Sequence, residues 1–121
     1  MTLVKRLAAA ALVALPTAPA AAEVTLINVF EVPKGRLETV VEAWAKARDF
    51  LSQEPGYVRT ALHRSLKPDE RFELINVAVW ESPEAFGAAV SKMRAAGVFP
   101  QIEGLVSTPA LYRVIRSDEA D

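Results

Sequence analysis

The hydrophobic and polar positions of this chain fall into short alternating runs and two longer stripes with helical spacing. The runs predict strands and the stripes predict helices, because side chains repeat every two residues in a strand and about every 3.6 in a helix. The expected elements cover residues 24–31, 37–51, 57–66, 72–80, 83–96 and 111–115. Their order, β-α-β-β-α-β, predicts an α+β, ferredoxin-like domain with both helices on one face of a four-stranded antiparallel sheet.

Local signals mark where the second helix and the last strand begin. Ser82 is a good N-cap, Pro83 suits the first helical position, and Gly97 is placed to end the helix. Residues 98–108 are expected to be irregular, because Pro100 and Gly104 interrupt them and Pro109 follows. Pro109 then delays the last strand to the residues that follow it.

The predicted sheet is apolar on both faces. One face packs under the helices, and the other carries the aliphatic residues Ile27, Val29, Ile75, Val77 and Val79. Monomers rarely leave so large an apolar patch in water. We therefore predict a symmetric homodimer in which two sheets pack face to face, a dimeric α+β barrel.

Two asparagines occupy the middle of strands where an apolar residue is usual. Asn28 lies in the first strand and Asn76 in the third, and these strands are neighbours in the predicted topology. Burying an unpaired amide costs about 1–3 kcal/mol. Either the two amides bond each other beside Trp80 in a closed core, or all three residues border a pocket for a polar group of a ligand.

Four aromatic residues are further candidates for lining such a pocket. Phe30 shares a strand face with Asn28, and Phe86 lies on the buried stripe of the second helix. Trp44 belongs to the stripe of the first helix, where it is either core or a wall against a ligand. Tyr57 begins the second strand, where its hydroxyl is either structural or available to a bound oxygen.

His63 is the only histidine of the chain. An imidazole can act as a general base near neutral pH. The strand that carries it has Val58 and Leu62 on the opposite face, and the turn at 67–70 decides which face points inward. His63 is therefore either a candidate base or a residue that faces solvent or an interface.

Residues 1–22 have the composition of an export signal. Two basic residues at 5–6 precede a short apolar stretch, and three consecutive alanines form a small-residue cleavage site before Glu23. Spanning a bilayer takes about 20 apolar residues, so an uncleaved anchor is the weaker alternative. We expect a periplasmic or secreted protein with one domain, 23–116, an acidic tail, 117–121, and no stable membrane anchor.

Composition excludes several classes of function. Without the two basic residues of the leader, the chain has 12 rather than 14 basic residues against 15 acidic ones, with no basic cluster, which argues against nucleic acid as a partner. One histidine and no cysteine exclude the common zinc sites and iron–sulfur clusters. No glycine-rich phosphate loop or Gly-x-Ser-x-Gly motif occurs. We therefore expect no metal and no cofactor.

The chain resembles the antibiotic biosynthesis monooxygenase family over nearly all of the predicted domain. Short stretches carry the resemblance: 27–33 (INVFEVP), Trp44, 55–57 (PGY), 62–65 (LHRS), 76–82 (NVAVWES), Phe86 and 111–112 (LY). Members of this family are dimeric α+β barrels, so the resemblance implies the same fold as the pattern.

Some members of the family oxygenate aromatic polyketides or quinols with molecular oxygen and without metal or flavin. The resemblance thus implies a monooxygenase for a small quinol, phenolic or polyketide-like aromatic compound whose anion passes an electron to oxygen. It also implies that Asn28 bonds a substrate oxygen or a peroxy intermediate, that Trp80 walls the pocket, and that His63 is a candidate base.

Two alternatives stay open at this point. The first is a non-catalytic, exported dimeric protein that binds a hydrophobic ligand in the same pocket. The second is haem binding or breakdown, because haem-degrading relatives have an asparagine and a tryptophan at positions that look equivalent to Asn28 and Trp80. Those relatives add a histidine ligand after the second helix, whereas residues 98–103 here contain none.

Overall fold

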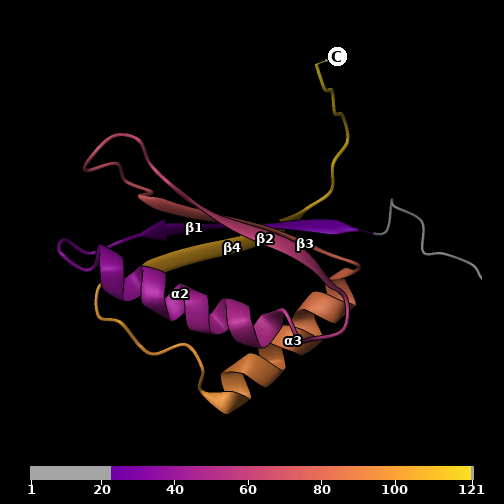
Figure 1. The fold of residues 1–121 in the computed structure, drawn as a ribbon, viewed down its shortest axis with the longest axis horizontal. Coiled ribbons are helices and arrows are strands. Elements are labelled where there is room, and N and C mark those ends of the chain that lie inside the picture. Colours follow the sequence, from indigo (N-terminus) through magenta and orange to yellow (C-terminus); the bar gives the residue numbers. More distant parts are fainter. Residues whose placement is uncertain (1–22, 121) are drawn as a thin grey trace, which may run out of the picture.

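The computed structural model describes residues 23–120 and shows the six expected elements in the expected order (Figure 1). They are β1 (Val24–Glu31), α2 (Leu37–Leu51), β2 (Tyr57–Arg64), β3 (Leu74–Trp80), α3 (Pro83–Ala96) and β4 (Val106–Tyr112). The strands form one antiparallel sheet in the order β2-β3-β1-β4. This confirms the ferredoxin-like α+β fold, while the predicted leader, 1–22, lies outside the described residues.

The ends of α3 follow the local signals in the sequence. The Ser82 hydroxyl accepts a 3.0 Å hydrogen bond from the Ala85 backbone N–H, and Pro83 takes the first helical position. At the other end Gly97 adopts a left-handed conformation with φ of 64°, which costs glycine little. Neither helix within residues 23–120 is long and apolar enough to cross a membrane.

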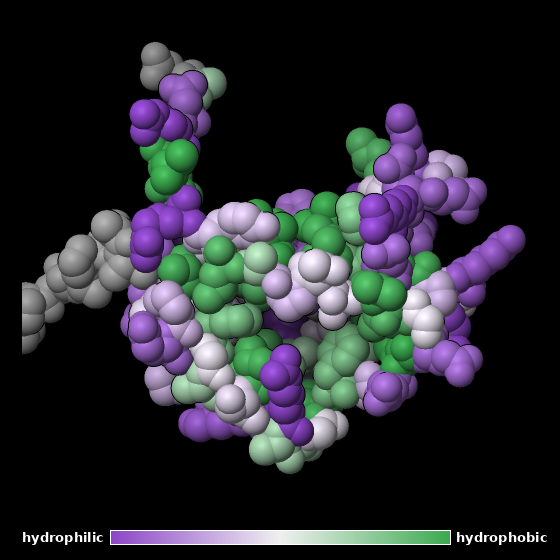
Figure 2. All heavy atoms as spheres, turned by 180° about the vertical axis from the view of Figure 1, so that it is seen from behind, coloured by the Kyte–Doolittle hydropathy of each residue, from purple (hydrophilic) through white to green (hydrophobic). Residues whose placement is uncertain are grey.

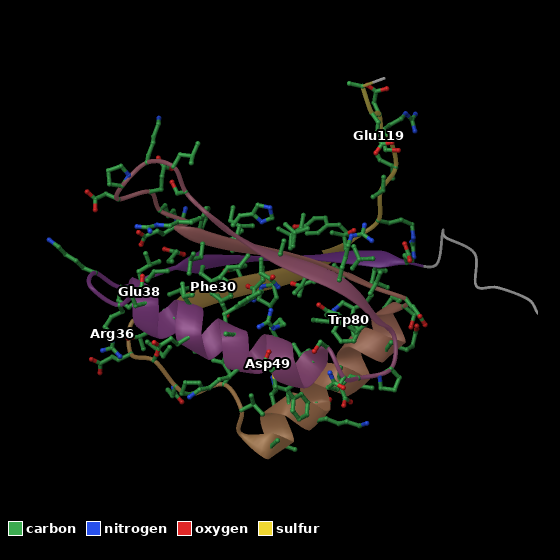
Figure 3. All side chains as sticks on the ribbon, viewed as in Figure 1. Phe30, Arg36, Glu38, Asp49, Trp80 and Glu119 are labelled. Carbon is green, nitrogen blue, oxygen red and sulfur yellow. The ribbon has the colours of Figure 1, made fainter. Side chains whose placement is uncertain are left out.

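Both helices pack against the same face of the sheet, and the core beneath them is divided in two (Figure 1). One cluster of buried residues contains Val24, Leu26, Ala78, Trp80 and Ala89. The other contains Phe30, Val40, Ala43, Leu74 and Ile102. Phe30 and Trp80 both lie between the sheet and the helices (Figure 3). Along β1 and β3, the positions between the two clusters are Asn28 and Asn76.

The last strand does not lie where the pattern placed it. β4 covers Val106–Tyr112 and includes Pro109, whereas a strand had been expected only over 111–115. Because β4 is at the edge of the sheet and pairs only with β1, half of its N–H groups face away from any partner. A proline is tolerated on such an edge, so Pro109 does not prevent the strand.

The centre of the sheet face without helices is apolar, as predicted. Ile27, Val29, Ile75 and Val77 sit at paired positions of β1 and β3, with alternation that points them away from the helices. We call this the open face. The β2–β3 loop and the segment after β4 both rise on this side (Figure 1). They carry the exposed apolar residues Leu66, Val114 and Ile115.

Candidate functional site

The floor of the candidate site is formed by two asparagines on neighbouring strands. Asn28 of β1 and Asn76 of β3 are direct cross-strand partners, so their side chains stand next to each other on the helix-covered face. Asn76 is buried, with only 8% of its surface exposed. The sequence had placed both amides here, and the register confirms that they meet.

The two amides do not satisfy each other. The Thr60 hydroxyl donates a 2.7 Å hydrogen bond to Oδ1 of Asn76, whereas Oδ1 of Asn28 is buried and has no hydrogen-bond partner among residues 23–120. A closed amide pair, the first of the two alternatives drawn from the sequence, is therefore not what the structure contains. Asn28 itself borders the gap between the two halves of the core.

That gap is a cavity of about 400 Å³ between the sheet and the helices. Trp44 and Leu51 of α2 and Phe86, Val90 and Met93 of α3 contribute to its walls. The molecule seen from behind is hollowed near its centre, inside a rim of mainly apolar residues (Figure 2). The volume lies within the range of pockets that bind small organic ligands, about 300–1,000 Å³.

One end of the cavity is aromatic. The Trp80 ring is 1% exposed and makes edge-to-face contacts with Tyr57, at 5.5 Å between centroids, and with Phe86, at 5.8 Å. Since each ring holds the next, the wall beside the asparagines is rigid and apolar. Such a wall suits a flat aromatic guest.

A β-bulge at the start of β2 brings Tyr57 into this wall. Tyr57 pairs with Trp80, yet Arg59 pairs with the adjacent Val79, so Val58 is the extra residue. Without the bulge, Tyr57 would share a face with Arg59 and point away from the cavity. Gly56, with φ of +90°, precedes the bulge, and its missing Cβ leaves room for Ala85 of α3.

Seven of the eight site residues predicted from the sequence line the cavity. They are Asn28, Phe30, Trp44, Tyr57, Asn76, Trp80 and Phe86. His63 does not join them. It is exposed on the open face opposite Ile75, and its Nδ1 lies 3.3 Å from the Ile75 carbonyl oxygen. The single-chain geometry therefore gives His63 no access to a ligand in the cavity.

Five further residues line the cavity that were not predicted as site residues from the sequence: Arg48, Thr60, Arg94, Ser107 and Pro109. Leu62, two residues on, had marked the inward face of β2, so this parity was the signal that could have found Thr60. Ser107 and Pro109 were missed because β4 was placed too late. Both arginines look like ordinary exposed helix residues in the sequence, and no pattern distinguishes them.

The charged side chains of the lining are all basic. Arg48 lies over the Trp44 ring, 5.6 Å from its centroid, and also pairs with Asp49 at 2.8 Å. Arg94 is the second lining arginine, and the described part of the cavity contains neither carboxylate nor imidazole. No group of three or more potential metal ligands occurs within residues 23–120. The cavity therefore favours neutral or anionic guests over cations.

The structure is a small α+β domain with a helix-roofed cavity on a ferredoxin-like sheet, amides on the cavity floor and an aromatic wall. Residues 23–93 match the sequence profile of the antibiotic biosynthesis monooxygenase family. The chain belongs to this family.

Similar proteins include both oxygenases and haem degraders. Deoxynogalonate monooxygenase of Streptomyces nogalater is 35% identical over 70 residues, which are 58% of this chain and 57% of that protein. The chain thus matches little more than half the length of that relative. SnoaB, a cofactor-independent oxygenase of the same organism, is 28% identical in structure comparison, with a TM-score of 0.64 over 80% of this chain and 97% of that one.

Two further structures show the range of sequence identity among the similar proteins. A candidate monooxygenase of Shewanella loihica PV-4 is 50% identical, with a TM-score of 0.73 over 79% of this chain and 97% of that one. The haem degrader MhuD of Mycobacterium tuberculosis, with two haems in its active site, is 27% identical, with a TM-score of 0.61 over 79% and 99%. Membership of the family alone therefore leaves both reactions open.

Proposed function

We propose that this protein is a cofactor-independent monooxygenase that oxidises a small quinol, phenolic or polyketide-like aromatic compound with molecular oxygen. One observation carries the proposal. Asn28 lines a cavity large enough for an aromatic ring system, and its buried amide oxygen has no hydrogen-bond partner among residues 23–120. Native folds retain few such uncompensated groups, and a ligand, an ion or a water usually supplies the missing bond.

The proposed chemistry balances without an external reductant. Conversion of an activated ring methylene to a carbonyl releases four electrons, and these reduce one O₂ to the new carbonyl oxygen and one water. The protein's part is to hold the substrate beside oxygen and to exclude water. Asn28 and Asn76 provide the polar contacts on the floor, and the aromatic wall around Trp80 holds the ring.

The absence of carboxylates and imidazole from the described lining restricts the substrate. No such group is available to remove a proton, so the substrate has to ionise at its own acidity or arrive as an anion. Arg48 and Arg94 favour that anion electrostatically. An electron-rich phenol or anthrone, which ionises readily and gives up an electron as the anion, meets this requirement.

The proposal includes a homodimer formed through the open face. The aliphatic side chains of β1 and β3 make this face a large apolar surface, and the segments rising beside it expose Leu66, Val114 and Ile115. A second copy would bury all of these surfaces at once and leave the cavity on the opposite side of the sheet. The proposal also includes export of the domain, with residues 1–22 as the signal.

Haem is the second candidate substrate, because the MhuD structures resemble this fold. The cavity does not favour it. The sole histidine lies on the other face of the sheet, so no imidazole of the same chain can bind haem iron in the cavity. Haem titration that gives a histidine-type Soret shift, abolished by His63→Ala, would reverse this ranking.

Oxygen consumption with a panel of hydroquinones and anthrones tests the proposal. We expect substrate-dependent uptake, and Asn28→Ala to lower it about tenfold or more, because it removes a contact to the reacting group. Unfolding stability should stay within about 1 kcal/mol, since Asn28 Oδ1 gives up no hydrogen bond. Thr25→Ala, on the same strand but the other face, is the matched control.

Two other outcomes of these measurements would contradict the proposal. Tight ligand binding without oxygen uptake would replace the enzyme by a carrier. Equal losses in Asn28→Ala and Thr25→Ala would show that the floor of the cavity has no special part in the reaction.

A further inference from the structure

The orientation of the Asn76 amide determines what the floor of the cavity offers to a ligand. A carboxamide has one end that accepts hydrogen bonds and another that donates two. If a protein group forms a hydrogen bond with one end of the amide, the other end remains available to a ligand. The group that forms this bond therefore determines whether the site binds a ligand acceptor or a ligand donor.

Thr60 is in position to make this choice. It lies on β2, on the same face as Asn76 and diagonally across from it, and its Oγ1 is 2.7 Å from Asn76 Oδ1. Thr60 Oγ1 is also 3.4 Å from the Val77 carbonyl oxygen. A hydroxyl has a single proton, so it can make only one of these two bonds as donor.

The two distances decide which bond forms. With the amide reversed, Thr60 would accept from the Asn76 amide nitrogen, and its own proton would be left with the Val77 carbonyl at 3.4 Å. That separation is beyond the usual O–H···O range of about 2.5–3.0 Å. The hydroxyl proton makes a bond of ordinary length only if Thr60 donates and Asn76 accepts. The Asn76 amino group then remains for the cavity.

We infer that Thr60 is a positioning residue. By donating to Asn76 Oδ1 it turns the Asn76 NH₂ toward the cavity. The floor thus presents an N–H donor beside Asn28. A donor at this point fits a carbonyl or ionised oxygen of an aromatic guest. The inference rests on the proposed function for its kinetic consequence, but not for the hydrogen bond itself.

Carbon NMR of the two side-chain carbonyls tests the hydrogen bond without any ligand. These are the only asparagines in the chain, and a carbonyl carbon moves downfield when its oxygen accepts a hydrogen bond. We expect the Asn76 Cγ downfield of the Asn28 Cγ in the unmodified protein. Thr60→Val should move the Asn76 signal upfield, whereas Thr60→Ser should retain it.

Thr25→Val, the same substitution on the open face, is the matched control and should shift neither signal. Coincident Asn28 and Asn76 signals in the unmodified protein would overturn the inference, and that measurement requires no variant to fold. An Asn76 signal that is unmoved in folded Thr60→Val would overturn it as well.

Oxygen uptake with the best substrate of the panel tests the consequence. Thr60→Val should lower kcat/KM about five- to tenfold, mainly through kcat, because a free amide is misoriented part of the time. Thr60→Ser should stay within about twofold of the unmodified protein, as expected when only the hydroxyl matters. Equal losses in both variants would overturn the positioning role. Absence of uptake by the unmodified protein would overturn the proposed function alone, and the carbon shifts would still decide the role of Thr60.

Discussion

The two faces of the sheet are built from alternate residues of the same strands, yet they have opposite character at their centres. On the helix-covered face, β1 and β3 place Asn28 beside Asn76 between two apolar clusters. On the open face, the adjoining positions hold Ile27, Val29 and Val77, without a polar break.

The polar pair points to ligand binding on the helix-covered face, and the aliphatic surface points to assembly on the open face. A polar pair in the middle of a core is costly unless something occupies the space above it. A continuous aliphatic surface is costly unless something apolar covers it. Each face therefore lacks a partner of a different kind, and changes on one face should leave the function of the other intact.

The largest effect is expected from removing the ring that joins the strands to α3. Trp80→Ala should lower the free energy of unfolding by about 3–5 kcal/mol, because Trp80 is almost fully buried against Tyr57 and Phe86. Lys46→Ala, at an exposed position of α2, should cost less than about 1 kcal/mol. Urea denaturation measures both. Similar losses would mean that the aromatic wall is not the core of the helix-covered face.

A charge on the open face should break assembly. Ile27→Asp is expected to weaken dimer formation about a hundredfold or more, because an unpaired carboxylate would be buried between two apolar sheets. Sedimentation velocity over a range of concentrations measures the change. Ser91→Asp, on the exposed surface of α3, should leave the association unchanged. An unmodified protein that is monomeric at all concentrations would contradict the homodimer.

A smaller effect is expected at the basic side of the cavity. Arg94→Gln should raise the KM for a phenolate substrate about three- to fivefold at low salt, and less at high salt, because the charge is partly exposed and screened. Lys46→Gln, an exposed change on α2 outside the cavity lining, is the control. A KM that does not respond to Arg94 would show that the substrate binds as a neutral molecule.

The smallest effect is expected from the histidine. His63→Ala should change oxygen uptake by less than about twofold, because the side chain is exposed on the face away from the cavity. Initial rates over the pH range of activity measure this. A tenfold loss would mean that the open face takes part in the reaction, and the separation between the two faces would fail.

The sequence predicted those parts of the fold that depend on local signals. Ser82, Pro83 and Gly97 marked the ends of α3, because caps and turn residues act through their immediate neighbours. The alternation in β1 and β3 placed Asn28 and Asn76 together, because antiparallel neighbours in this topology share a face. The homodimer and the export signal stay predictions.

The bounds of β4 and the faces of the β2 residues could not be predicted from the hydrophobic periodicity alone. Pro109 was interpreted as a strand breaker, since the rule against proline holds inside a sheet and the edge position of β4 is a tertiary fact. The bulge at Val58 inverts the face of Tyr57 relative to the rest of β2, so simple alternation could not place it. The faces of Thr60 and His63 depended on the turn between β2 and β3, and the apolar Leu62 was the sequence signal for which face points inward.

The bulge has a consequence for how this cavity can change size. Deleting Val58 would restore strict alternation in β2, turn the phenol ring of Tyr57 out to the opposite surface, and open one wall, while residues from Arg59 onward kept their partners. The loss of a single codon at this position is thus a route by which related proteins could accept bulkier molecules without replacing any of the groups on the floor.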